Sequence, residues 1–175
     1  MDKTAYFNDL MARTEELFYH ELSDCAAWKT EFIGIDFIRA KAIQGDTPGQ
    51  IIENCIREMA GAGLIKEASY SIGGESILLY LKVRGCIHVP KEVKLQQGGI
   101  EPYNCPIINM ILDQLIEKLN FATTYVAELE VDADKGECTV KSAIFETADK
   151  IGNVCDWSDE CRLIDENDQW ETVSC

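Results

Sequence analysis

Apolar side chains recur at spacings of three, four and seven over the first 22 residues of the chain. This is the period of one face of an α-helix, so the segment predicts an amphipathic helix that begins near Asp2 or Thr4 and packs its apolar stripe against the core. The stripe comprises Phe7, Leu10, Met11, Leu17, Phe18 and Leu22. Residues 25–43 are rich in large apolar side chains without a clear period, and we interpret them as a further helix.

Two later helices are marked by a proline at their first turn. Thr47 precedes Pro48 and is followed by a glutamine three residues later, a capping-box pattern that predicts a helix from Pro48 to about residue 60. Its buried face would hold Ile51, Ile52, Cys55, Ile56 and Met59. Pro106 opens a helix of about fifteen residues. Its buried side would hold Ile107, Ile108, Ile111, Leu112, Leu115 and Leu119. A shorter helix is expected over residues 90–97.

Four segments have the composition of β-strands and are expected to pair as two hairpins. They are residues 64–72, 76–84, 125–131 and 139–145. Gly73 and Gly74 join the first two strands, and so short a connection allows only antiparallel neighbours. The turn-forming residues 132–136 join the last two strands. Residues 77–81 are apolar without alternation, which predicts that both faces of the second strand are covered.

This order of helices, hairpin, helix and hairpin predicts an α+β fold, in which an antiparallel sheet of two hairpins is covered by helices. Residues 1–148 would form one domain. Residues 149–175 are acidic and lack a clear period, so we interpret them as a tail that docks through Trp157 and Trp170. The tail cysteines are Cys155, Cys161 and Cys175, to which the sequence assigns no role.

The charge of the chain narrows the choice of partners. It has 16 Lys and Arg residues against 31 Asp and Glu residues, a net charge of −15, which disfavours nucleic acid and anionic membranes. The sequence has no apolar leader at its start and no run of about 18 apolar residues. We therefore expect a cytoplasmic protein that does not enter a membrane. Its eight cysteines are then expected to be reduced thiols, available for metal ligation or redox chemistry.

The residues that could bind a metal or catalyse a reaction lie at the ends of the predicted helices and strands. Cys86 and His88 follow the second strand, Cys105 stands at the start of a helix, and Cys138 follows the last hairpin turn. Thiolate and imidazole ligands suit zinc, iron or an iron–sulfur cluster, and a helix N-terminus favours the thiolate of Cys105. Two alternatives remain open, because the chain has no paired C-x-x-C motif. The thiols could be buried structural residues, or Cys86 or Cys105 could form a catalytic dyad with His88.

Residues 85–146 resemble the 4-vinyl-reductase domain, a small-molecule-binding fold related to haem nitric-oxide sensors and to a Golgi transport-complex subunit. The resemblance lies in Cys105 at a helix start, Glu128 and Glu130 on the following strand, and Cys138 beyond the turn. Sensor members of that family hold zinc with a Cys at the helix start, a Glu on the strand and two Cys around the turn. The resemblance implies zinc or iron, including haem iron, at this site. Either Glu130 or Cys86 would replace the missing cysteine.

The same region is similar, more weakly, to the L-2-amino-thiazoline-4-carboxylate hydrolase family. Cys86, Cys105 and Cys138 follow the order of cysteines in that family, although no catalytic role transfers to any of them. The folds related to the 4-vinyl-reductase domain often dimerise through helices, which implies a homodimer.

We expect the chain to bind a small apolar molecule or a metal-containing cofactor, in the manner of a sensor, between its sheet and the helices opened by Pro48 and Pro106. The expected lining residues are Ile52, Met59, Tyr80, Met110 and Ile111. The expected metal ligands are Cys86, His88, Cys105, Glu128, Glu130 and Cys138. The competing hypotheses are a small cysteine-dependent hydrolase or reductase and a scaffold subunit of a larger assembly.

Overall fold

The computed structural model describes residues 2–22, 26–73, 77–147 and 171–173. Its helices are α1 (Lys3–Leu22), α2 (Ala26–Lys29), α3 (Ile35–Arg39), α4 (Pro48–Gly61), α5 (Val89–Gln97) and α6 (Pro106–Leu119). Its strands are β1 (Glu67–Gly73), β2 (Ile77–Arg84), β3 (Thr123–Asp132), β4 (Glu137–Phe145) and β5 (Glu171–Val173).

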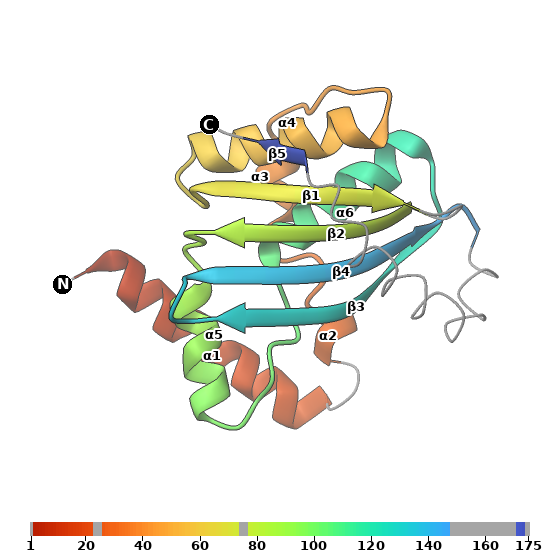
Figure 1. Ribbon diagram of the computed structural model, residues 1–175. Helices are drawn as coiled ribbons and strands as arrows, with labels where there is room; N and C mark the ends of the chain where they lie inside the picture. The colour runs from red at the N-terminus through yellow and green to blue at the C-terminus, as the bar shows by residue number, and fades with distance from the viewer. Residues whose placement is uncertain (1, 23–25, 74–76, 148–170, 174–175) are drawn as a thin grey trace.

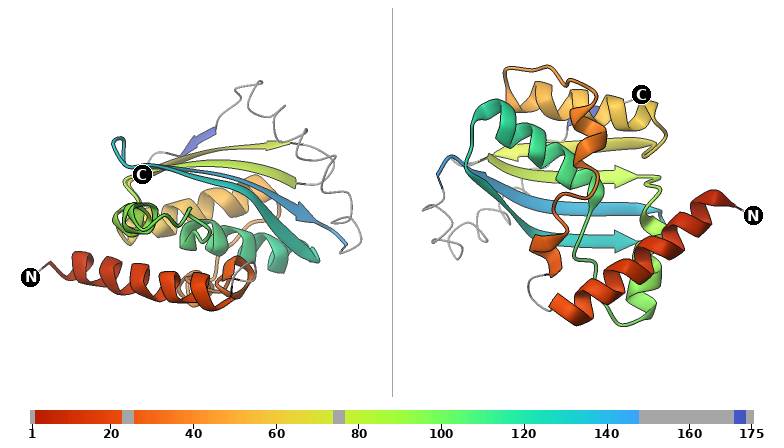
Figure 2. Two further views of the ribbon diagram at one scale, coloured as in Figure 1. Left: turned by 90° about the horizontal axis from the view of Figure 1, so that it is seen from below. Right: turned by 180° about the vertical axis from the view of Figure 1, so that it is seen from behind.

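The strands form one antiparallel sheet in the order β3-β4-β2-β1-β5 (Figure 1). β1 and β2 pair as a hairpin in which Tyr70 lies opposite Leu81, and β3 and β4 form the second hairpin. The hairpins join through β2 and β4, where Val83 lies opposite Cys138. The helices lie on one face of the sheet (Figure 2). The predicted α+β fold, an antiparallel sheet of two hairpins covered by helices, is confirmed.

The core lies between the sheet and helices α4 and α6, which begin at Pro48 and Pro106. The side chain of Thr47 accepts a hydrogen bond from the backbone N–H of Gln50 at 3.3 Å, so α4 begins at the predicted cap. All five residues expected on its buried face are buried, and α6 also buries its predicted apolar side, except that Leu119 is half-buried. Leu78 and Leu79 point to opposite faces of β2 and are each 1% exposed, which confirms the predicted cover on both faces.

Helix α1 is present, but the prediction for its packing face is wrong for Phe7, Leu10 and Leu17. Phe7, Leu10 and Leu17 are 57%, 49% and 56% exposed, whereas Asn8 and Glu15 are buried. The reason is that α1 packs against α5, which presents polar partners to it (Figure 1). The side-chain amide of Asn8 donates to the backbone oxygen of Ile87 at 2.9 Å, and the buried carboxylate of Glu15 binds a lysine of α5. Phe7, Leu10 and Leu17 therefore face outward, whereas the other stripe residues, Met11, Phe18 and Leu22, are half-buried.

Residues 25–43 contain two short helices, α2 and α3, where the sequence analysis predicted one. The chain turns at Gly34, whose φ of +96° is in the left-handed region. A Cβ atom there would lie 3.3 Å from both the Pro106 carbonyl oxygen and Met110 Cγ. Glycine thus allows this turn to pack closely on α6, which an uninterrupted helix would prevent.

The end of the chain returns to the sheet through β5. β5 pairs antiparallel with β1, where Val173 lies opposite Ala68. The predicted docking through Trp157 and Trp170 lies outside the described residues, as do Cys155, Cys161 and Cys175. Among the described residues, none of the helices combines the length and apolar character needed to cross a membrane.

Candidate ligand pocket and buried thiol cluster

A pocket of about 680 Å³ opens along the edge strand β3. It is bounded by β3, by α6 and by the segments that precede α3 and α6. Its apolar wall includes Ile35, Leu112, Ile116 and Leu129. Tyr103, Asn104, Cys105 and Asn109 bring polar groups to another part of the lining. The pocket therefore combines an extended apolar surface with a small number of fixed polar groups.

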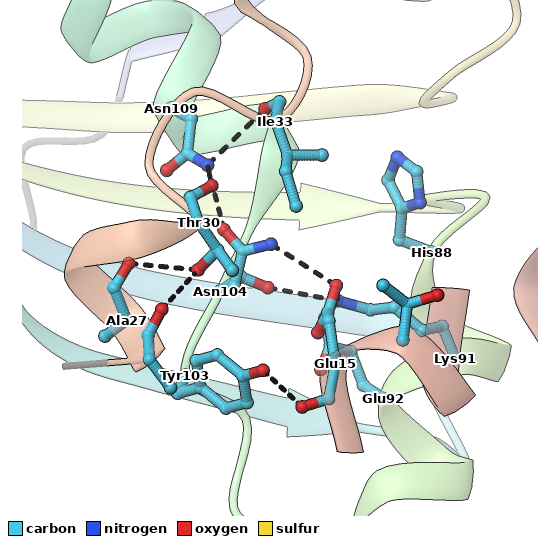
Figure 3. A network of polar contacts seen from close by, with 12 residues as sticks. Glu15, Ala27, Thr30, Ile33, His88, Lys91, Glu92, Tyr103, Asn104 and Asn109 are labelled. Carbon is cyan, nitrogen blue, oxygen red and sulfur yellow. Dashed lines mark hydrogen bonds and ion pairs between the residues drawn. The ribbon is translucent and has the colours of Figure 1, made fainter. Parts of the chain in front are cut away.

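Hydrogen bonds from α6 fix this polar wall. The side-chain amide of Asn109 donates to Asn104 Oδ1 at 2.9 Å and to the backbone oxygens of Thr30 and Ile33 at 3.3 and 3.4 Å (Figure 3). These bonds connect three separate segments, because Thr30 and Ile33 lie between α2 and α3, and Asn104 lies just before α6. Tyr103 is fixed in turn, since its hydroxyl donates to the backbone oxygen of Glu15 at 2.6 Å.

Behind this wall lies a buried ion cluster centred on Lys91, which is 0% exposed. Its ammonium group contacts both carboxylate oxygens of Glu15 at 2.9 and 2.8 Å and Glu92 Oε1 at 2.6 Å. It also donates to the backbone oxygen of Asn104 at 3.1 Å. The cluster links α1, α5 and the polar wall of the pocket (Figure 3). The buried ammonium group of Lys91 thus forms ion pairs with two buried carboxyl groups.

Burial shifts the pKa values of the acidic and the basic groups of this cluster in opposite directions. It raises the pKa of Glu92 to about 7, because Lys91 only partly offsets the loss of water around the carboxylate. Burial alone would lower the pKa of Lys91, but the carboxylates of Glu92 and Glu15 outweigh it and raise that pKa. The pKa of His88 falls to about 4, mainly through burial and also through the nearby charge of Lys91. His88 is therefore a neutral imidazole near neutral pH.

Three of the predicted site cysteines converge in the core. Cys86 lies between β2 and α5, Cys105 is the N-cap residue of α6, and Cys138 lies on β4. Their side chains are 6%, 6% and 3% exposed. The sulfur of Cys86 accepts a hydrogen bond from the backbone N–H of His88 at 3.4 Å.

The surroundings shift the pKa values of the three thiols in different directions. The pKa of Cys86 is lowered, first by the neighbouring thiol of Cys138 and then by the backbone N–H of His88, against the opposing effect of burial. The neighbouring thiol of Cys86, together with burial, raises the pKa of Cys138. Burial and the neighbouring Cys86 raise the pKa of Cys105 to about 12. The helix N-terminus therefore does not make Cys105 the favoured thiolate, as the sequence had suggested, because burial outweighs it.

The structure does not bring Glu128 and Glu130 to these thiols. Both lie on β3, where Leu129 and Val131 pack on the core, so alternation places the two glutamates on the opposite face. Glu128 pairs with Lys141 at 2.9 Å and borders the pocket at the sheet edge. Within the described ranges, no group of three or more Cys, His, Asp or Glu side chains is arranged to hold a metal ion.

None of the five residues expected to line a ligand site borders the pocket beside β3. Ile52, Met59, Met110 and Ile111 are at most 1% exposed and pack within the core. Tyr80 lies on the opposite face of the sheet, where Lys141 sits 5.4 Å from its ring centre. The expectation of a ligand site between the sheet and both long helices stays a prediction for these residues.

Sequence reasoning missed the polar wall of the observed pocket. Its signal was the presence of Asn109 on the otherwise apolar side of α6, with Tyr103 and Asn104 just before that helix. A buried amide on an apolar helix face must find hydrogen-bond partners, which indicates a neighbouring backbone segment. That signal could have placed residues 30–33 against α6.

Comparisons of this chain with protein-family models, with curated proteins and with solved structures each found no match.

Proposed function

We propose that the chain is a small-molecule-binding domain whose ligand occupies the pocket beside β3. The observation that carries this proposal is a volume of about 680 Å³, which lies in the usual range for ligand pockets. Ile35, Leu112 and Ile116 would receive an apolar body. The hydrogen-bonded wall at Asn104 and Asn109 is held in place before any ligand arrives, which lowers the cost of ordering the site.

Filling this pocket should weaken binding of a neutral apolar probe such as Nile red. Ile116 is half-buried and borders the pocket, so Ile116→Trp adds bulk there with little disturbance of the core. We expect the affinity for Nile red, measured by fluorescence titration, to fall by at least about tenfold, which corresponds to about 1.4 kcal/mol. Ile72→Trp, at a 37% exposed position on β1, provides a control that should leave the affinity unchanged. Equal binding by all three proteins would place the probe elsewhere and overturn the proposal.

Metal binding at the thiols is the second candidate function and stays a prediction. It is favoured by the convergence of Cys86, Cys105 and Cys138 from three elements, since thiolates suit zinc and iron. Metal analysis of protein purified without oxygen tests it. Stoichiometric metal that is lost in Cys105→Ser supports a site at these residues, whereas metal-free, folded protein counts against it.

A cysteine-dependent hydrolase or reductase receives less support. The contact between Cys86 and His88 is made by the backbone N–H of His88, and the imidazole has a pKa of about 4. So weak a base is poorly matched to removing a thiol proton near neutral pH.

We further propose that the protein forms a homodimer through α1. Its outward stripe exposes four large apolar or aromatic side chains, an unusual concentration for one face of a monomer. They are Tyr6, Phe7, Leu10 and Leu17. A stripe along one straight helix is self-complementary, so a second copy can cover it about a two-fold axis.

Acidic substitution on this stripe should separate the dimer. Phe7→Glu combined with Leu17→Glu should shift the mass measured by light scattering at micromolar concentration from dimer to monomer, because the charges would lose water in the interface. Phe32→Glu makes the same change at a 65% exposed position outside α1 and should leave a dimer. A monomeric unmodified protein would contradict the proposal. A double variant that stays dimeric would place the interface on another face.

A further inference from the structure

The pocket beside β3 has acidic side chains in its lining but no basic ones. Among the described residues that border it, Glu31, Asp113 and Glu128 are acidic, and none is Lys, Arg or His. The three carboxylates come from separate parts of the chain, since Glu31 lies between α2 and α3, Asp113 on α6 and Glu128 on β3. A cleft lined by one sign of charge attracts ligands of the opposite sign. The pocket therefore favours a cationic ligand over an anionic one.

Two of these carboxylates already have basic partners that lie outside the lining. Asp113 accepts two hydrogen bonds from the guanidinium group of Arg39, at 2.6 and 3.0 Å. Glu128 pairs with the ammonium group of Lys141 at 2.9 Å. A charge that is balanced within the protein contributes little to binding a ligand. The negative charge that is left for a ligand thus belongs to Glu31.

The carboxylate of Glu31 has no hydrogen bond or ion pair with any residue in the part of the chain that the structure describes. Partial loss of water raises the pKa of this carboxyl group, and no positive charge opposes that rise. Glu31 is nevertheless exposed at the border of the pocket, so a bound molecule can reach it. An ammonium group placed there would restore the interactions that the carboxylate has lost with water.

Hydrogen bonds on both sides of Glu31 hold its backbone in place. The hydroxyl of Thr30 donates to two backbone oxygens of α2 at 3.0 and 2.9 Å. The backbone oxygens of Thr30 and Ile33 both accept the side-chain amide of Asn109, at 3.3 and 3.4 Å (Figure 3). The backbone N–H of Ile33 also donates to the oxygen of Thr30 at 3.1 Å. The turn that carries Glu31 is therefore fixed against α6 before a ligand binds, which lowers the cost of binding.

The rest of the lining suits the apolar body of such a ligand. Ile35 follows the turn, and Leu112 and Ile116 lie four residues apart on α6, so they share one face of that helix. Tyr103 and Tyr125 bring aromatic rings to the same lining. The face of an aromatic ring attracts a cation, so these rings are compatible with a positive charge.

We propose that the ligand of this pocket is an apolar molecule with one protonated amine group, and that Glu31 binds the amine. The ammonium group donates hydrogen bonds to the carboxylate, while the hydrocarbon body lies against Ile35, Leu112 and Ile116. The proposal rests on the small-molecule pocket proposed above and names the chemical class of its ligand. Nile red has no such amine and would use the apolar wall alone.

Three probes with the same hydrocarbon chain and different head groups test the proposal. Decylamine, decan-1-ol and decanoate are titrated separately into the full chain near neutral pH, below their micelle concentrations, and the affinities are measured by calorimetry. We expect decylamine to bind at least about fivefold more tightly than decan-1-ol, because a hydrogen bond between charged groups is stronger than one between neutral groups. Decanoate should bind most weakly, since its charge has the same sign as that of Glu31.

Variants assign this preference to one side chain. Glu31→Gln keeps the shape of the side chain and should lower the affinity for decylamine to that for decan-1-ol, while the affinities for decan-1-ol and Nile red stay unchanged. Glu58→Gln removes the same charge from α4, outside the pocket lining, where Glu58 is 45% exposed and pairs with Lys41 at 3.6 Å. It should leave the affinity for decylamine unchanged, because salt screens distant charges. Ile116→Trp should weaken binding of decylamine and decan-1-ol alike.

The outcomes separate this proposal from the function on which it rests. Equal affinities for decylamine and decan-1-ol, a preference for decylamine that persists in Glu31→Gln, or equal losses in Glu31→Gln and Glu58→Gln would each overturn the role of Glu31. The pocket itself would stand in those cases if Ile116→Trp still weakened binding of decan-1-ol. If none of the three probes bound, or if Ile116→Trp changed neither affinity, both the pocket function and the amine ligand would be wrong.

Discussion

Replacing Lys91 with methionine is expected to lower the free energy of unfolding by about 3–5 kcal/mol. Lys91 is 0% exposed and is the shared cation of Glu15 and Glu92, which are 1% and 3% exposed. Methionine keeps much of the length and apolar body of lysine but supplies no charge or hydrogen-bond donor. Two buried carboxyl groups and the backbone oxygen of Asn104 would then lose their common partner. Urea unfolding followed by circular dichroism measures the loss.

The effect of Lys91→Met should grow with pH. The pKa of Glu92 is about 7 in the folded protein, above its ordinary value of 4.5. A carboxyl group with a raised pKa favours folding fully below its ordinary pKa, and this contribution disappears as the pH rises through the folded value. Without the lysine cation that pKa rises further. We therefore expect a larger loss at about pH 8 than at about pH 5.

Lys94→Met is the matched control for this prediction. Lys94 also lies on α5 and pairs with Asp9 of α1 at 2.6 Å, but both partners are exposed. An exposed ion pair contributes little to stability, because water screens the two charges. A loss for Lys91→Met no larger than that of Lys94→Met at both pH values would contradict the account of the buried cluster.

Replacing Asn109 with alanine is expected to cost about 2–4 kcal/mol of unfolding free energy, because each buried acceptor left without its partner costs about 1–3 kcal/mol. The amide of Asn109 serves Asn104 Oδ1 and the backbone oxygens of Thr30 and Ile33. Urea unfolding again provides the measurement. The substitution should also weaken binding of Nile red, because these bonds hold residues 30–33 against the pocket wall.

Asn54→Ala provides the comparison. The side-chain amide of Asn54 donates to the backbone oxygen of Gln44 at 2.7 Å, but the bond is exposed, so water can replace the lost donor. We expect a cost of at most about 1 kcal/mol. Equal losses for Asn54→Ala and Asn109→Ala would show that the network behind the pocket contributes no more than an ordinary surface hydrogen bond.

The helices and hairpins that the sequence predicted best are those in which local signals agree with tertiary packing. Pro48 and its cap placed α4, and the Gly73-Gly74 connection placed the first hairpin. α1 differs because its period fixes a helix but does not decide which face packs inward. That choice depends on Lys91, which lies far along the chain and draws Glu15 into the interior.

The sequence likewise predicted some residues of the candidate site correctly and misplaced others. Cys86, Cys105 and Cys138 could be brought together from the sequence, because each follows or begins a regular element in a short antiparallel unit. Glu128 and Glu130 were misplaced although the necessary pattern was present. Their positions alternate with Leu129 and Val131, and strand geometry sends the two sets to opposite faces. The pocket itself depends on how residues 30–35 lie against α6, and the only local signal for this packing is the buried amide of Asn109 on the apolar side of that helix.

The strand order has a consequence for how the chain folds. Each hairpin closes through neighbouring residues, and isolated hairpins form in about 1–10 μs. The sheet is completed only when β2 meets β4 across α5 and α6, and β5 reaches β1 from the end of the chain. Such distant pairings slow folding, since loop closure must precede the contacts that reward it.

During synthesis β1 and β2 emerge before β4 exists. The edge of β2 that will pair with β4 is therefore left open for a time, along an apolar stretch that contains Leu78, Leu79 and Leu81. An open apolar strand edge is a template for pairing with another chain. The strand at the centre of the finished sheet, β2, can thus pair with another chain until β4 is made.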